Sequence, residues 1–277
     1  ESYLLKMLIN SKEVSKTEFK NAIKNTYGYA INDKTVESTI NSLNFEFITE
    51  NFEGSLITVA SKYDIKILNV EDEKITLNEK FINLLSNTTF LEFLNDNIAY
   101  AIQTFDNLFD IDIYHEGFLL YQKYSRKDVI RILNWPKNPV AQNIGGYIVS
   151  ADKSNCPIFV NYHKEEHISN STKYEDHFIN NYEFAWMTKS NRTLQSNEVQ
   201  LMKANQDNFR LPLFIKKNND EGLEFYYMGD MTPIQESFEQ TTMVNDAGRN
   251  VSVVKISFVM KTPVEEQIYN YITEFGI

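Results

Sequence analysis

Aromatic, acidic and basic side chains gather in one stretch of the sequence, TKYEDHFINNYEFAWMTKSNRT, residues 172–193. The stretch contains Tyr174, Glu175, Asp176, His177, Tyr182, Phe184, Trp186, Lys189 and Arg192. Flat rings can stack on a nucleobase that has left the helix, a carboxylate can accept a hydrogen bond from its exocyclic amine, and cations can hold the flanking phosphates. This combination indicates a nucleobase-binding site.

The same rings also have a structural interpretation. Tyr182, Phe184 and Trp186 alternate with other residues, so on a β-strand they share one face and would form part of a hydrophobic core. The spacing alone is compatible with both interpretations.

Other chemistry has weaker support. HKEEH, residues 163–167, matches the H-x-x-E-H zinc pattern, but a strand-like run precedes it and a turn-rich stretch follows, so its ligands would not share a helical face. Cys156, the single cysteine, precedes Pro157 at the start of an apolar run and is expected to be a small buried residue. Phosphate-loop, dinucleotide and serine-hydrolase signatures are absent from the sequence. We therefore predict no catalytic residues, no metal site and no cofactor in this chain.

The charge is unevenly distributed. The 277 residues hold 27 Lys and Arg against 38 Asp and Glu, a net charge of −11, which excludes a globally basic nucleic-acid protein. Residues 118–217 nevertheless hold 14 basic and 9 acidic residues, a local surplus of 5. Such a surplus can steer a polyanion, and it is also typical of a solvated surface. With one cysteine and no long apolar stretch, we expect a cytoplasmic protein that makes no contact with a membrane.

Residues 1–115 are expected to form a mainly helical domain. Phe19, Ile23 and Tyr27 recur at helical spacing, and a second amphipathic helix follows Asn32. Short apolar runs from Ser55 to Leu77 predict a small sheet, and helices resume from Leu77 to Leu108. This order predicts a winged-helix-like domain. Because it is acidic and lacks Arg, we expect it to be a connector or docking domain.

Residues 116–277 are expected to form a curved sheet or small barrel, which makes the fold class α+β. Ser125 and Asp128 form a capping-box pattern at the start of a helix that Trp135-Pro136 ends. Six apolar runs then predict strands: GGYIVSA, CPIFVNYH, YEFAWMT, LPLFIKK, LEFYYMGDM and VVKISFVM.

Several of these runs resemble a known family. GFLLYQKYSRKDVIRILNW, CPIFVNYHK, STKYEDHF and FAWMTKSNRT are similar to the C-terminal part of modification-dependent (type IV) restriction endonucleases that contain a helicase. The resemblance covers about residues 117–275. It implies a parent enzyme with a phospholipase-D-type nuclease and a helicase motor that uses ATP and Mg²⁺, both outside this chain, and a recognition region that binds 5-methylcytosine.

The same segment resembles SET- and RING-associated (SRA) domains, which have a PUA-like barrel and flip a methylated cytosine into a pocket. Tyr174, Glu175 and Asp176 match the first three positions of the family's Tyr-Glu-Asp-Asp pattern, and Trp186 takes the place of its second aromatic residue. His177 stands where the family has its base-reading Asp. The resemblance therefore leaves two residues for the Watson–Crick edge, Asp176 and His177.

We hypothesise that this region binds methylated double-stranded DNA by base flipping, with 5-methylcytosine or 5-hydroxymethylcytosine as the base. The expected base-binding residues are Tyr174, Glu175, Asp176, His177, Trp186 and Thr188, and the expected DNA-backbone residues are Arg126, Lys127, Lys173, Lys189, Ser190 and Arg192. The alternatives are a barrel that binds RNA or single-stranded DNA by stacking, and a docking domain for the helicase motor.

Overall fold

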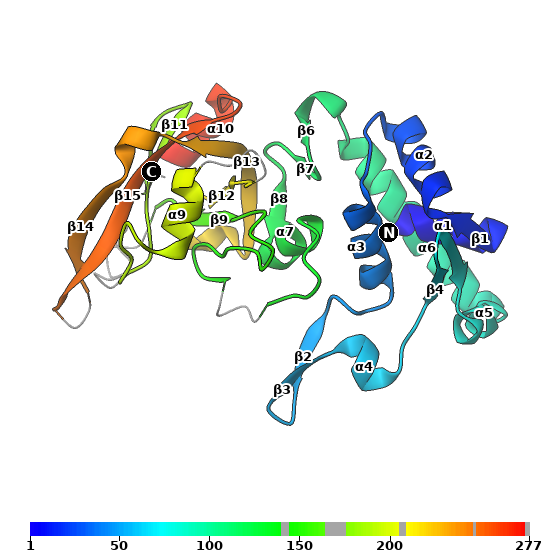
Figure 1. Ribbon diagram of the computed structural model, residues 1–277. Helices are drawn as coiled ribbons and strands as arrows, with labels where there is room; N and C mark the ends of the chain where they lie inside the picture. Colours follow the sequence, from blue (N-terminus) through cyan, green and yellow to red (C-terminus); the bar gives the residue numbers. More distant parts are fainter. Residues whose placement is uncertain (140–143, 164–175, 205–208, 246–247, 275–277) are drawn as a thin grey trace. The chain divides into compact units, whose positions relative to one another are not determined.

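The computed structural model describes residues 1–139, 144–163, 176–204, 209–245 and 248–274. Two compact units divide the chain: Glu1–Leu119 with Ile130–Pro139, and Leu120–Val129 with Val140–Ile277 (Figure 1). Ile130–Pro139, which lies beyond the predicted boundary at residue 115, thus belongs to the first unit. No helix in the described ranges is long and apolar enough to cross a membrane.

The first unit has the winged-helix order that the sequence predicts. Its elements are α1 (Ser2–Ser11), β1 (Glu13–Ser15), α2 (Lys16–Tyr27), α3 (Asp33–Leu43), β4 (Leu68–Glu71) and β5 (Lys74–Leu77). The three strands form an antiparallel sheet in the order β1-β5-β4. A capping box between Ser15 and Glu18 starts α2, and Gly28 ends it in the left-handed conformation.

Further elements complete this unit. The hairpin β2 (Thr49–Phe52) and β3 (Ser55–Thr58), followed by α4 (Val59–Tyr63), is inserted between α3 and β4. The helices α5 (Glu79–Leu85) and α6 (Thr88–Leu108) follow β5, and η1 (Ile111–Ile113) precedes the short pair β6 (Tyr114–His115) and β7 (Phe118–Leu119).

Asn44 joins the end of α3 to the start of β4. Its side chain is buried, and its Oδ1 accepts hydrogen bonds from the backbone N–H groups of Ile67 (2.9 Å) and Leu68 (2.7 Å). Its Nδ2 donates to the Leu68 carbonyl at 3.1 Å. One amide thus satisfies three backbone groups at the edge of the sheet, beside a core that contains Leu68 and Val36.

The second unit is built on one curled sheet of eight strands. Its strands are β8 (Lys123–Ser125), β9 (Ile158–Asn161), β10 (His177–Asn180), β11 (Glu183–Met187), β12 (Pro212–Lys216), β13 (Glu224–Pro233), β14 (Glu239–Val244) and β15 (Asn250–Met260). The order is β10-β11-β15-β13-β12-β9, with β14 also paired to β15 and β8 to β13. Its helices are α9 (Asn197–Ala204), α10 (Glu266–Thr273) and the part of α7 (Arg126–Ile132) before Ile130, with short turns η3 (Asn219–Glu221) and η4 (Gln235–Ser237).

Two long strands curl this sheet because each changes its partner along its length. β15 pairs with β14 from Asn250 to Lys255 and with β13 from Phe258 to Met260. β13 pairs with β15 from Met231 to Pro233 and with β12 from Tyr226 to Asp230. The register of the β12 pairing shifts between Tyr227 and Gly229, whose φ is +112°. A glycine at such a bulge lets a strand bend sharply. The predicted α+β class and curved sheet are confirmed.

The strands of the second unit differ from the sequence expectations in two respects. The run GGYIVSA is not a strand; Tyr147 alone forms an isolated bridge to Ile158. β10 and β14 were not expected, because their short runs are rich in polar residues.

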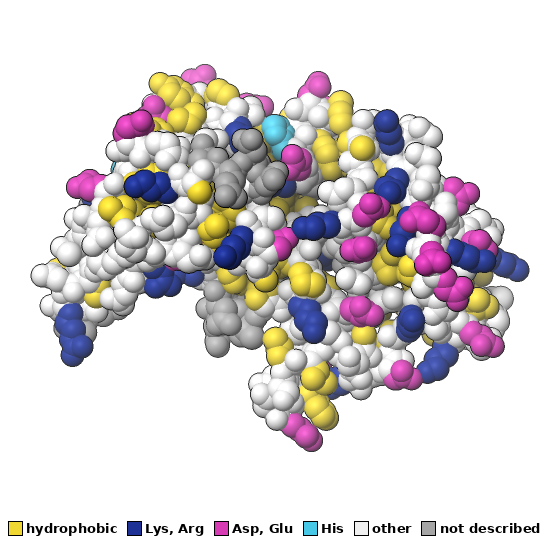
Figure 2. Space-filling model, in the orientation of Figure 1, with side chains coloured by type: hydrophobic (Ala, Val, Ile, Leu, Met, Phe, Trp, Pro, Cys, Tyr) yellow, Lys and Arg dark blue, Asp and Glu magenta, His cyan; other side chains and the backbone are white. Residues whose placement is uncertain are grey.

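On the face drawn in Figure 2, Lys and Arg side chains are dispersed among acidic and uncharged ones.

We expect Asn44→Ala to lower the free energy of unfolding by about 3 kcal/mol, because it leaves buried backbone groups without partners. Urea denaturation followed by circular dichroism measures this change. Asn95→Ala, at an exposed position of α6, is the control and should change stability by less than about 0.5 kcal/mol. An Asn44 variant as stable as the control would show that the three bonds contribute little.

Candidate functional site

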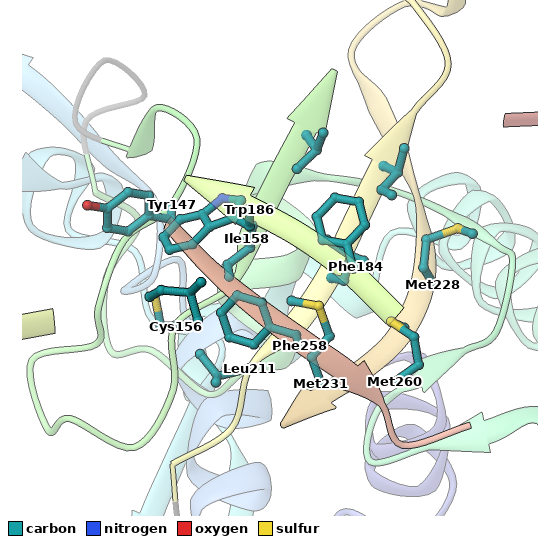
Figure 3. Close-up of a cluster of buried hydrophobic side chains, with 14 of the residues drawn as sticks. Tyr147, Cys156, Ile158, Phe184, Trp186, Leu211, Met228, Met231, Phe258 and Met260 are labelled. Carbon is teal, nitrogen blue, oxygen red and sulfur yellow. The ribbon is translucent and has the colours of Figure 1, made fainter. Parts of the chain in front are cut away.

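β11 presents two different faces. Phe184 and Trp186 point into the core of the second unit, where they are 0% and 4% exposed. The Trp186 ring makes edge-on contacts with Tyr147 (5.0 Å between centroids) and Phe258 (5.9 Å), as Figure 3 shows. The ring thus has no open face for a base. Phe184 and Trp186 are therefore core residues, which is one of the two interpretations of the alternating aromatic residues. The predicted stacking of Trp186 on a base does not fit this arrangement.

The opposite face of β11 forms the floor of a hollow. Ala185 lies between His177 of β10 and Ser257 of β15 in the register of the sheet, and Met187 lies beside Lys255. The hollow measures about 510 Å³, including the part that is open to solvent. It is lined by His177, Ala185, Trp186, Met187, Ser237, Glu239, Lys255, Ile256 and Ser257. Among these residues, Trp186 and Ile256 belong to the core cluster on the other face of the sheet.

Asp176 lies one residue before β10, next to His177, and is not itself one of the residues that line the hollow. Its Oδ1 accepts a hydrogen bond from the backbone N–H of Met187 at 3.0 Å. The bond fixes the carboxylate against the strand that supplies the floor. His177 follows as the first residue of β10, is exposed, and lines the hollow. The structure therefore brings together both residues that were candidates for reading the Watson–Crick edge.

The remaining wall comes from the corner between β13 and β14. Ser237 of η4 accepts a hydrogen bond from the Ser257 N–H (2.9 Å) and donates to the Ile234 carbonyl (2.6 Å). Glu239 of β14 lies opposite Lys255 in the register of β15. Ser237, Glu239, Lys255 and Ser257 were not predicted, because only the sheet register brings them beside residues 176–187. The sequence pattern that indicated a base-binding site was confined to residues 172–193.

Three predicted site residues fall outside the described residues. These are Lys173, Tyr174 and Glu175.

Thr188, a predicted base-binding residue, has a structural role. It is fully buried, its Oγ1 accepts from the Val254 N–H at 2.9 Å, and its own N–H donates to the Val254 carbonyl at 3.0 Å. These bonds continue the pairing of the chain with β15 after the end of β11. The hydroxyl is directed at backbone, so the predicted contact with a base would require this bond to break.

Lys189, a predicted DNA-backbone residue, binds carbonyl groups of its own unit. Its Nζ donates to the carbonyls of Tyr147 (2.7 Å) and Ile144 (3.3 Å) and lies 4.5 Å from the centre of the Tyr147 ring. Burial lowers the pKa of Lys189. The side chain therefore ties down the loop at residues 144–147. Ser190 lies half-buried in the turn that follows.

Arg192, the next residue predicted to bind the DNA backbone, forms an ion pair within the protein. Its Nε donates to Glu198 Oε1, which also accepts from the Tyr147 hydroxyl at 3.0 Å. Burial alone would raise the pKa of Glu198, but the hydrogen bonds from its own N–H, Arg192 and Tyr147 outweigh it and hold that pKa below its ordinary value. If Lys189 or Arg192 bound a phosphate, as predicted, that phosphate would compete with these internal contacts.

Arg126 and Lys127, the two residues of α7 predicted to bind the DNA backbone, lie in the second unit but away from the hollow. The Arg126 guanidinium packs over the rings of Phe225 and Phe159, and Lys127 is exposed. Neither residue lines the hollow.

The residues considered for metal or thiol chemistry, His163 and Cys156, are bonded or buried within the fold. His163 Nε2 lies 2.9 Å from the Ile272 carbonyl, and residues 164–167 of the HKEEH pattern fall outside the described residues. Within the described ranges, no group of three or more His, Cys, Asp or Glu residues could hold a metal ion. Cys156 is buried, and burial raises the pKa of its thiol.

A winged-helix-like unit and a curled sheet with a polar hollow together define a two-part α+β protein with a candidate ligand-binding region in its second part. By sequence, the chain belongs to the family described as Domain of unknown function (DUF3427), whose model matches residues 118–272. A second family model, Domain of unknown function (DUF8090), matches residues 1–107. Among curated proteins, none matches this chain.

Several solved structures show a distant likeness. One is the DNA modification-dependent restriction endonuclease AspBHI, with 12% identity, a TM-score of 0.35, and coverage of 54% of this chain and 77% of that one. Another is Arabidopsis thaliana SUVH6 in complex with SAM, with 12% identity, a TM-score of 0.33, and coverage of 62% and 33%. A third is KRYPTONITE in complex with mCHG DNA and SAH, with 12% identity, a TM-score of 0.30, and coverage of 55% and 35%.

We expect Glu198→Gln to lower the free energy of unfolding by about 1 kcal/mol at pH 7, because the amide keeps the hydrogen-bond geometry and removes the charge. A carboxylate with a lowered pKa stabilises the fold above its unfolded pKa of about 4.3, and this contribution is lost as the pH falls through the lower, folded value. The difference between wild type and variant should therefore shrink below about pH 4. Denaturant titrations between pH 3 and pH 7 measure it. Glu224→Gln, at an exposed position, is the control. A difference that does not change with pH would exclude this role for the Glu198 charge.

Proposed function

We propose that residues 116–277 form the DNA-recognition region of a modification-dependent restriction enzyme and bind a flipped 5-methylcytosine in double-stranded DNA. The observation that carries this proposal is the hollow beside Asp176 and His177, the two residues that the sequence selects for reading a base. In this proposal the chain makes and breaks no bond, because its task is recognition.

The hollow and the neighbouring Asp176 suit a cytosine with a small substituent at C5. Asp176 supplies a carboxylate that can accept a hydrogen bond from the 4-amino group. Ala185 and Met187 supply an apolar floor, on which a methyl group contributes about 0.8 kcal/mol when it is buried. Discrimination by one carbon is therefore modest, about 10- to 200-fold. Thymine presents an O4 acceptor in place of the amine, so a carboxylate rejects it more strongly.

Stacking requires flat groups beside the hollow. His177 is the lining residue with a ring that stands outside the core cluster, and we assign it one face of the base. We keep the sequence-based expectation that Tyr174 covers the other face, and leave out Trp186 because its ring is enclosed by the core. Flipping costs a few kcal/mol, so stacking and phosphate contacts must supply most of the binding energy.

The proposed ligand, modified DNA, agrees with the names of two of the similar solved structures. AspBHI is a DNA modification-dependent restriction endonuclease, and KRYPTONITE was solved with mCHG DNA. We extend that class of ligand to this chain as part of the proposal. The proposal also includes a parent protein whose helicase and nuclease parts lie outside this chain, with ATP and Mg²⁺ bound by the motor, and a connector or docking role for the acidic first unit.

Filling the hollow tests the proposal. We expect Ala185→Leu to abolish the preference for a 5-methylcytosine duplex over an unmodified duplex, because the larger side chain occupies the floor on which the base would lie. Fluorescence anisotropy at fixed salt measures both dissociation constants, and the melting temperature should change little because position 185 faces outward. Val259→Leu, two residues beyond Ser257 on the same strand face, is the control. A preference that survives Ala185→Leu would remove the hollow from the proposal.

Changing the carboxylate tests the hydrogen bond to the base. We expect Asp176→Asn to weaken binding of the methylated duplex by about 10- to 100-fold, the range for a hydrogen bond to a charged group. The amide oxygen can still accept from the Met187 N–H, so the strand geometry is kept. His177→Ala, measured beside it, should reduce affinity through lost stacking and keep rejection of a thymine-containing site. If the His177 variant loses that rejection and the Asp176 variant keeps it, the roles of the two residues are reversed.

A further inference from the structure

Arg126 has unusual surroundings for an arginine in this chain. The guanidinium lies 4.6 Å from the centre of the Phe225 ring and 5.3 Å from that of Phe159. Both rings are buried, at 1% and 4% exposure. Arg126 Nε is itself buried and has no hydrogen-bond partner among the described residues. The aromatic residues therefore hold the guanidinium in place without satisfying its donors.

Three other arginines of the chain have carboxylate partners. Arg131 pairs with Glu1, and Arg192 pairs with Glu198. Arg210 lies 2.7 Å from Asp230 and also donates to the Tyr227 hydroxyl at 3.3 Å. Arg126 has no ion pair within the described part of the chain, and burial lowers its pKa. Partial burial of a cation without an anion costs free energy, and such a cost is often associated with ligand binding.

A second cation lies at the same ring. Lys216 of β12 places its Nζ 5.4 Å from the centre of the Phe225 ring, where it also donates to the Gly222 carbonyl at 3.0 Å. Burial lowers the pKa of Lys216, and the nearby charge of Arg126 lowers it further. Two like charges near one aromatic ring repel each other, and an anion bound beside them would relieve that repulsion.

We propose that Arg126 and Lys216 form a binding site for a phosphodiester of the DNA backbone, separate from the hollow at Asp176. The two rings engage none of the N–H donors of the guanidinium, and a guanidinium binds a phosphate through two parallel hydrogen bonds. Lys216 adds a point charge from the neighbouring strand. No residue of this pair lines the hollow. The choice of DNA as the source of the phosphate rests on the proposed function.

Arg126→Met in the full chain tests this site. Methionine keeps the apolar contact with the rings and removes the charge and the donors. We expect binding to DNA to weaken about tenfold, equally for methylated and unmodified duplexes, and the slope of log K against log salt to fall in magnitude by about 0.9, the value for one lost phosphate contact. We also expect the variant to melt no lower than wild type in the absence of DNA, because an unpaired, partly buried charge is removed.

Lys261→Gln, at an exposed position after β15, is the matched control for loss of one positive charge. An unchanged salt slope in Arg126→Met would overturn the site, and so would a selective loss of binding to methylated DNA, which would place Arg126 at the base. A lower melting temperature with an unchanged slope would assign Arg126 a packing role alone.

Inorganic phosphate separates this inference from the proposed function. We expect millimolar phosphate to raise the melting temperature of wild type more than that of Arg126→Met at matched ionic strength. If the chain shows no preference for methylated DNA, the proposed function fails while the salt slope and the phosphate shift still support the site. If modified-DNA preference is present and neither the slope nor the phosphate shift depends on Arg126, the site fails alone.

Discussion

The alternation of side chains along β11 determines the rest of the candidate site. A strand turns successive residues to opposite faces, so once Phe184 and Trp186 enter the core, Ala185 and Met187 must face outward. The hydrogen bond from the Met187 N–H to Asp176 then fixes a carboxylate beside that outward face. A shift of one residue in the register would expose two aromatic rings and bury the Glu183 carboxylate, which is why the arrangement is strongly specified.

The hollow also depends on how the sheet curls. β15 leaves β14 and joins β13 in the stretch where it pairs with β11, and η4 crosses between those two partners. Ser237 closes this corner through its bonds to both the N–H and the carbonyl of Ser257. A flat sheet would carry side chains of neighbouring strands in continuous rows. The change of partner instead leaves a hollow whose walls come from residues 177, 237, 239 and 255.

The sequence predicted local features well and long-range ones poorly. The N-cap bond predicted at Ser125 is present, since its Oγ accepts from the Asp128 N–H (3.2 Å) and also donates to the Asp128 carboxylate (2.6 Å); both residues lie within one turn. The helices α2 and α3 of the first unit follow equally from local periodicity. Lys255 could not be predicted as a neighbour of Met187, because their pairing depends on a register set by residues far apart in the chain. The alternation that left Trp186 with two interpretations is resolved only by the core that Tyr147 and Phe258 build around it.

The same distinction applies to charge. Counting basic residues finds a surplus between residues 118 and 217, but a count does not show which cations are already engaged. Lys189 is held by backbone carbonyls and Arg192 by Glu198, so each would have to give up internal contacts to bind a phosphate. Affinity for a polyanion depends on the cations that can release its counterions, and a cation that is already neutralised adds little. Arg126 differs because aromatic rings position it without neutralising it, and for this reason we propose Arg126, in place of Lys189 or Arg192, as a phosphate-binding residue.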